Sequence, residues 1–152
     1  TCRKILTEDE LIAVNDKVEE IGKIIKRYPP FKRPGIIKYI QRDIYQAETS
    51  QVVFGFGEMD WNILVPIGGT AWATFAGVLK GIDVFFYDQK KKMWFKYQDK
   101  TKNRWIDIAD IPEYIFDYTD FTGIGTRKID IAAVDIIRDL VKRYKNNSKQ
   151  KE

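Results

Sequence analysis

VPIGGTAWA, residues 65–73, is the stretch that decides the predicted fold. It joins an apolar run predicted as a strand, Asn62–Val65, through a double glycine to an apolar run predicted as a helix, Thr70–Leu79. Glycine lets the backbone turn sharply and approach a ligand closely, and the first amides of a helix lack partners within the helix. The stretch therefore predicts a phosphate-binding loop at a helix N-terminus.

A second predicted strand follows this helix. Ile82–Tyr87 is almost wholly apolar, which is typical of a strand buried on both faces of a parallel sheet. The predicted unit is strand, loop, helix and strand, and it ends at Asp88. Ligands of open α/β sheets bind at the carboxyl ends of the strands, so we expect Asp88 to meet a ribose hydroxyl of a nucleotide.

The composition indicates one globular domain. The chain has 152 residues, of which 44% are hydrophobic and 14% aromatic, enough for a single substantial core. No apolar run approaches the roughly 18 residues that a membrane span requires, so we expect no membrane partner. We expect the domain to cover residues 1–145 and a disordered polar tail to cover 146–152.

The cysteine, histidine and charge content limits the kinds of functional site that we expect in this chain. Cys2 is the single cysteine and no signal peptide is apparent, so we expect a reducing, cytoplasmic setting. Histidine is absent, which excludes His-based catalysis and His-containing metal sites, and we expect neither a metal nor a cofactor. The net charge of +4 arises from 26 basic and 22 acidic residues mixed along the chain, which favours a small anionic ligand over nucleic acid.

Two helices are predicted before the first strand. A capping box that begins at Thr7 opens a helix over 8–27, and Pro34 opens a second helix. Arg42 and Asp43 lie beside the apolar stripe of this second helix, and we count Arg42 among the candidate ligand contacts.

The run Gln51–Gly57 is predicted as a buried strand that ends in glycine and is followed by Glu58 and Asp60. A strand that ends in small residues and then polar ones can form one wall of a ligand cleft, or it can simply turn tightly. Both interpretations stay open for Gly57.

Two short strands, Met93–Tyr97 and Arg104–Ile108, are predicted after the central unit. Trp94 in the first of them, like Trp72 in the helix after the double glycine, either packs in the core or stacks on a base. Both uses stay open.

A second glycine segment, Phe121–Arg127, is predicted as a loop that opens a helix over 130–144. We expect Gly123, Gly125 and Thr126 to offer backbone amides, and the forked guanidinium of Arg127 to bind a phosphate or carboxylate. Neither glycine segment is a Walker motif or fits the GxGxxG fingerprint.

Six segments of the chain occur in an order that resembles a known superfamily: Gln41–Ala47, Val52–Gly57, Gly68–Ala73, Val84–Gln89, Met93–Phe95 and Gly123–Arg127. Together, over about residues 36–145, they resemble the SLOG-type Rossmann-like proteins. These include the Lonely Guy and lysine-decarboxylase-like phosphoribohydrolases, DNA-processing protein A, and nucleotide-sensing domains of bacterial and viral conflict systems. The resemblance implies a three-layer, doubly wound α/β domain that binds a nucleotide or nucleotide-derived molecule, in a phage, viral or other conflict-system protein.

The sequence departs from that superfamily in two places. Thr74 stands where the phosphoribohydrolases carry a catalytic glutamate. The Gly123–Arg127 segment resembles the opening strand and loop of many relatives, yet it lies near the end of this chain. The domain is therefore predicted to be either permuted or shortened at its amino terminus.

Three functions are compatible with these residues. The first is a sensor or sequestering protein for an ADP-ribose-like or cyclic nucleotide signal, which we expect to form a homodimer. The second is an N-glycosidic hydrolase of a nucleoside phosphate, with Glu58 or Asp60 as the catalytic carboxylate. The third is an interaction domain without a ligand. For the first, the expected contacts are Gly57, Gly68, Gly69, Thr70, Trp72, Asp88, Trp94, Gly123, Gly125, Thr126, Arg127 and Arg42.

Overall fold

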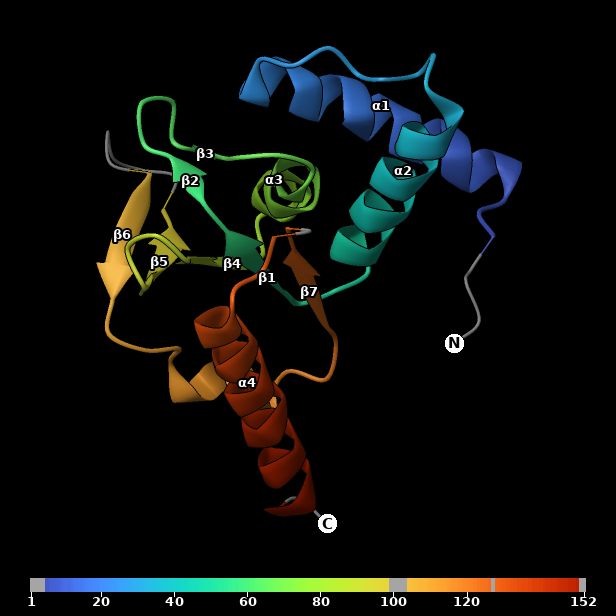
Figure 1. Ribbon diagram of the computed structural model, residues 1–152. Helices are drawn as coiled ribbons and strands as arrows, with labels where there is room; N and C mark the ends of the chain where they lie inside the picture. Colours follow the sequence, from blue (N-terminus) through green and yellow to red (C-terminus); the bar gives the residue numbers. More distant parts are fainter. Residues whose placement is uncertain (1–4, 99–103, 127, 151–152) are drawn as a thin grey trace.

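The computed structural model describes residues 5–98, 104–126 and 128–150, which form an α/β domain with helices on both faces of a central sheet (Figure 1). The helical elements are α1 (Glu8–Ile25), α2 (Pro34–Glu48), α3 (Thr70–Lys80), the 3₁₀ helix η1 (Glu113–Asp117) and α4 (Ile131–Gln150). The strands are β1 (Val52–Gly57), β2 (Met59–Asp60), β3 (Val65–Pro66), β4 (Asp83–Asp88), β5 (Met93–Tyr97), β6 (Trp105–Ile108) and β7 (Phe121–Gly125).

The central sheet has the strand order β6-β5-β4-β1-β7. β1 pairs in parallel with β4 and with β7, whereas β5 runs antiparallel to both β4 and β6. Four of the five strands therefore point in the same direction, and the predicted single Rossmann-like α/β domain with a mostly parallel sheet is confirmed. The connection from β1 to β4 passes through α3, so the start of α3 lies near the carboxyl ends of these strands.

One face of the sheet packs against α2 and α3, and α1 lies across these two helices (Figure 1). The predicted capping box is confirmed, because the Thr7 hydroxyl accepts from the Glu10 amide and the Glu10 carboxylate accepts from the Thr7 amide. The apolar stripes predicted for the first two helices face this core, where Val18, Ile21 and Ile44 are fully buried.

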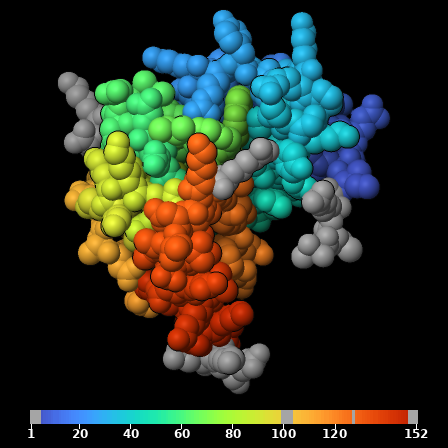
Figure 2. All heavy atoms as spheres, in the orientation of Figure 1, coloured from blue at the N-terminus to red at the C-terminus, as the bar shows by residue number. Residues whose placement is uncertain are grey.

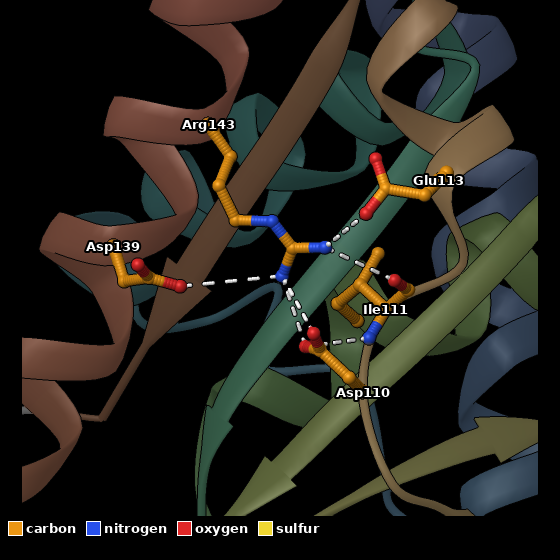
Figure 3. A network of polar contacts seen from close by, with 5 residues as sticks. All are labelled: Asp110, Ile111, Glu113, Asp139 and Arg143. Carbon is orange, nitrogen blue, oxygen red and sulfur yellow. Dashed lines mark hydrogen bonds and ion pairs between the residues drawn. The ribbon is translucent and has the colours of Figure 1, made fainter.

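The other face packs against η1 and α4, and α4 covers it in the space-filling view (Figure 2). Arg143 joins these two elements: its guanidinium donates to both Asp110 oxygens at 2.9 and 3.0 Å, to Glu113 at 3.2 Å and to the Ile111 carbonyl at 3.3 Å (Figure 3). Because these partners precede or lie in η1, the network fixes α4 against the chain that leads into β7.

The strand predicted at Asn62–Val65 is wrong in most of its length. Residues 61–64 form a turn, and β3 pairs antiparallel with β2 in a separate two-stranded ribbon. The Asp60 carboxylate accepts from the Asn62 amide at 3.0 Å, and Leu64 adopts a φ of 59°. Such an Asx turn ends the extended chain, so the strand that precedes α3 in the central sheet is β1.

The last helix is longer than the sequence indicates. α4 continues to Gln150, whereas the apolar pattern ends at Tyr144 and predicts a disordered polar tail over 146–152, of which 151 and 152 lie outside the described residues. The Asn147 side-chain amide donates to the Phe116 carbonyl at 2.5 Å and to the Asp117 carboxylate at 3.3 Å. A polar contact thus anchors a turn that has little apolar surface to bury. Among the described residues, the helices are too short or too polar to cross a membrane.

Candidate functional site

The carboxyl ends of β1, β4 and β7 come together at one edge of the sheet. The Gly57 carbonyl, at the end of β1, accepts from the Gln89 amide at 2.7 Å, and the Phe56 carbonyl accepts from the Thr126 amide at 3.0 Å. A Cβ atom built on Gly57 would lie 3.5 Å from Thr126 Cβ. The structure therefore brings together Gly57 and Thr126, two residues that the sequence assigns to one ligand site.

The double glycine lies immediately before α3. Gly68 has a φ of 80°, the left-handed region that glycine adopts without strain. A Cβ atom built on either Gly68 or Gly69 would meet no heavy atom within 4 Å. Among the residues that the structure describes, none accepts a hydrogen bond from the amides of Gly68 and Gly69. These two amides are therefore available to an anion at the positive end of the helix dipole.

Arg27 holds this loop in place from the end of α1. Its guanidinium donates to the Gly68 carbonyl at 2.6 Å and to the Pro66 carbonyl at 2.9 Å. Burial lowers the pKa of Arg27 from its ordinary value, although the group stays charged at neutral pH. No local sequence pattern marks Arg27, because the contact joins residues far apart in the chain.

Basic residues are frequent in the segment that contains Arg27 and in the turn after β4. Residues 23–42 contain seven Lys or Arg and no Asp or Glu. Lys90, Lys91 and Lys92 form the turn after β4. The Lys91 ammonium lies 3.7 Å from the centre of the Trp61 ring, which places this cation over the ribbon that leads to the double glycine. Of these basic residues, Arg27 contacts the loop itself and Lys91 contacts the ribbon before it, which also carries the carboxylates of Glu58 and Asp60.

Asp88 is engaged within the fold, which corrects its expected role as a ribose contact. Its side chain is 1% exposed. One carboxylate oxygen accepts from the Met59 amide at 3.2 Å and from the Trp61 indole at 2.9 Å. The other accepts from the amides of Lys90 and Lys91 at 2.8 and 3.0 Å. Asp88 therefore joins the β2–β3 ribbon to the turn after β4.

Thr70, Trp72 and Trp94 are also turned inward, with 4%, 4% and 6% of their surface exposed. Trp94 makes edge contacts with Phe56 and Tyr87, with ring centroids 5.5 and 5.4 Å apart. The two tryptophans thus belong to the core, the more common use of a large aromatic side chain, and offer little ring surface to a base.

The second glycine segment is a strand and not a loop. Phe121–Gly125 forms β7, paired in parallel with β1, and α4 begins only at Ile131. Asp130 caps that helix, since its carboxylate accepts from the Ala133 amide at 2.8 Å. The amides of Gly123 and Gly125 therefore do not lie at a helix N-terminus. Arg127 lies outside the described residues.

The remaining predicted residues do not gather at the loop. The Glu58 carboxylate is exposed, and the Asp60 carboxylate caps its own turn. The Arg42 guanidinium stacks over the Tyr39 ring at 5.0 Å on α2. Glu58 and Asp60 stay near the ribbon, where solvent reaches them, and nothing about their contacts distinguishes them as catalytic groups.

Asp43 is a carboxyl group that the sequence analysis noted without assigning a role. Burial raises its pKa to about 6, and the neighbouring Arg42 lowers it only in part. It lies on α2, which packs against both α3 and β7. A carboxyl group with a pKa near neutrality can give or take a proton under physiological conditions.

Comparisons with protein-family models, with curated proteins and with solved structures give no match to this chain.

Proposed function

We propose that this protein binds a nucleotide-derived anion, such as an ADP-ribose-like or cyclic nucleotide signal, and acts as a sensor or sequestering protein. The observation that carries the proposal is the pair of open amides at Gly68 and Gly69, immediately before α3 and beside the carboxyl ends of β1 and β4. An anion placed there gains backbone hydrogen bonds and the favourable end of the helix dipole without any side-chain rearrangement.

Three further features support the same site. Arg27 pre-organises the loop through two carbonyl groups, so little ordering of the backbone is required on binding. Gly57 and Thr126 lie in contact where β1 and β7 end, the edge of the sheet at which ligands of such folds bind. The SLOG-type proteins that the sequence resembles place nucleotide phosphates at a corresponding glycine loop.

The first experiment is a thermal-shift panel of mononucleotides, NAD, ADP-ribose and cyclic nucleotides. A ligand that binds only the native state raises the melting temperature by mass action. Each mixture is then analysed by mass spectrometry for intact ligand. We expect a shift with an intact phosphate-bearing ligand, and no shift with any compound would favour an interaction domain instead.

Gly69→Val tests whether the loop is the site. A valine side chain at this position occupies the space before α3 without a clash inside the fold, so we expect a folded protein that has lost the ligand-induced shift. Gly123→Val is the matched control, since its Cβ also meets no heavy atom within 4 Å but lies on β7. Equal ligand binding by Gly69→Val and wild type would refute the loop at Gly68 and Gly69 as the binding site.

A second candidate function is hydrolysis of an N-glycosidic bond, for which the chain offers a carboxyl group of raised pKa, Asp43, on the helix that packs against α3. A carboxyl group with a pKa of about 6 is suited to protonate a leaving base or to activate water. If the mass spectra show free base and ribose phosphate, Asp43→Asn is assayed, and loss of turnover with binding kept would assign the proton transfer to this carboxyl group. Glu58→Gln and Asp60→Asn are the comparison variants, because the sequence nominated those carboxylates.

A further inference from the structure

The outer edge of β7 is open. β7 ends the strand order of the central sheet, and within the described residues no strand pairs with its far side (Figure 1). The Thr126 amide donates to β1, and the Asp120 carbonyl accepts from the Gln51 amide. Backbone groups alternate along a strand, so the even-numbered residues of this segment bond to β1. The N–H and C=O groups of Phe121, Gly123 and Gly125 therefore point away from the sheet.

The exposure along β7 follows the same alternation. Phe121, Gly123 and Gly125 are exposed, whereas Thr122 is buried and Ile124 is partly buried. Edge strands are usually protected by charge, proline or a bulge. The residues Phe121–Gly125 contain neither charge nor proline, and they pair with β1 in an unbroken register. This edge is therefore able to accept another strand.

Gly123 has no explanation within the monomer. Its φ lies outside the left-handed region, and a Cβ atom built on it would meet nothing within 4 Å. Gly125 differs, because its Cβ would lie 2.4 Å from Ile129 Cδ1. Glycine weakens a strand interior and often marks a place where another backbone approaches closely. Gly123 is the central residue of the open edge.

We propose that β7 of one chain pairs antiparallel with β7 of a second copy, with Gly123 opposite Gly123 on a two-fold axis. In this register each outward-facing residue exchanges both of its backbone hydrogen bonds, Gly123 with Gly123 and Phe121 with Gly125. The two sheets become one continuous sheet across the dimer. This pairing is independent of the ligand site at Gly68 and Gly69.

Charge complementarity favours a second copy over an unrelated peptide. Asp117 and Asp120 precede β7 and Lys128 follows it. Antiparallel pairing places Lys128 of each copy beside the Asp117–Asp120 segment of the other, twice by symmetry. A depression of about 400 Å³ adjoins that segment and is lined by Gln46, Thr49, Ser50, Thr119, Asp120, Phe121, Thr122 and Gly123. It lies where the chain after β7 of the second copy would enter.

Sedimentation equilibrium tests the proposal over a range of protein concentrations. We expect the mass to rise from 17.8 kDa toward twice that value in the wild type. Gly123→Lys places two like charges opposite each other at the two-fold axis and should raise the dimer Kd by about tenfold or more. Gly35→Lys is the matched control, because Gly35 is equally open but lies on α2, and it should dimerise like the wild type.

Amide hydrogen exchange on the wild type gives a second readout that needs no variant. The amides of Phe121, Gly123 and Gly125 should become protected as concentration rises, whereas those of Thr122 and Ile124 should be protected throughout. A monomer at all concentrations would overturn the proposal. So would a dimer that leaves these three amides unprotected or that Gly123→Lys does not weaken.

Discussion

The loop at Gly68 and Gly69 holds two amides that donate to no described residue, immediately before a helix, whereas the strand at Gly123 and Gly125 directs free amides along the edge of a sheet. In the first region Gly69 is followed at once by α3, so the helix dipole adds to the two amides. In the second, α4 begins only at Ile131, and the amides are spaced for a neighbouring strand. The chemistry of a glycine pair is thus set by the element that follows it.

The largest loss of stability is expected from Asp88→Ala. The substitution leaves the amides of Met59, Lys90 and Lys91 and the Trp61 indole without their buried acceptor. We expect a loss of roughly 3–5 kcal/mol in the free energy of unfolding, the scale for removing a buried charged partner. Urea denaturation measures it, with Asp60→Ala as a control that should change stability by less than about 1 kcal/mol.

Asp88→Ala also separates the two regions. Because Asp88 positions the ribbon that leads into Gly68, ligand binding at the loop should be lost even in conditions where the variant is folded. Self-association through β7 should persist, since β7 does not contact Asp88 through any bond that the structure describes. A variant as stable as wild type would contradict the role assigned to this carboxylate.

An intermediate effect is expected from Asp43→Asn, on the helix that packs against both regions. The pKa of Asp43 is raised in the folded state to about 6, so its ionisation disfavours folding as pH rises from about 4 through 6. Removing the charge should raise the free energy of unfolding by roughly 1–3 kcal/mol at pH 8, with the partial exposure of the side chain favouring the lower end.

The pH dependence supplies the control for Asp43→Asn. At pH 4 and below, wild-type Asp43 is protonated in the folded state, and the two proteins should have similar stability. Thermal melts of the two proteins at pH 4 and pH 8 measure this difference in stability. A stabilisation that is equal at pH 4 and pH 8 would show that burial of the charge is not its cause.

The smallest changes in stability are expected from substitutions of single glycines by alanine. Gly68→Ala forces alanine to a φ of 80° and should cost about 1–2 kcal/mol, whereas Gly69→Ala and Gly123→Ala meet no neighbour and should each change stability by less than about 1 kcal/mol. Chemical denaturation of the three variants ranks them. Equal losses at all three positions would mean that the turn at Gly68 has no special conformation.

The helices and strands were predictable wherever local pattern decides structure. The capping box at Thr7, Pro34 at the start of α2 and the apolar runs of β1 and β4 all indicate the observed elements. The sequence also indicates the start of α3 after Gly69. Each of these signals depends on residues within one or two turns of each other.

The candidate site was less predictable because it depends on contacts distant in sequence. Arg27 binds the Gly68 carbonyl across 41 positions, and Asp88 accepts from Trp61 across 27, and neither pairing leaves a local pattern. Trp94 illustrates the converse. An aromatic residue on a short strand fits both a core and a stacking role, and only the position of β5 against β4 places it in the core.

The open amides of Gly68 and Gly69 carry the proposed ligand site, and an amide NMR titration tests them directly. With ADP-ribose or AMP as the titrant, we expect saturable chemical-shift changes at Gly68, Gly69 and Thr70 and none of similar size at Gly123 and Gly125. Changes centred on Gly123 and Gly125, or saturable binding that leaves Gly68 and Gly69 unshifted, would contradict the account.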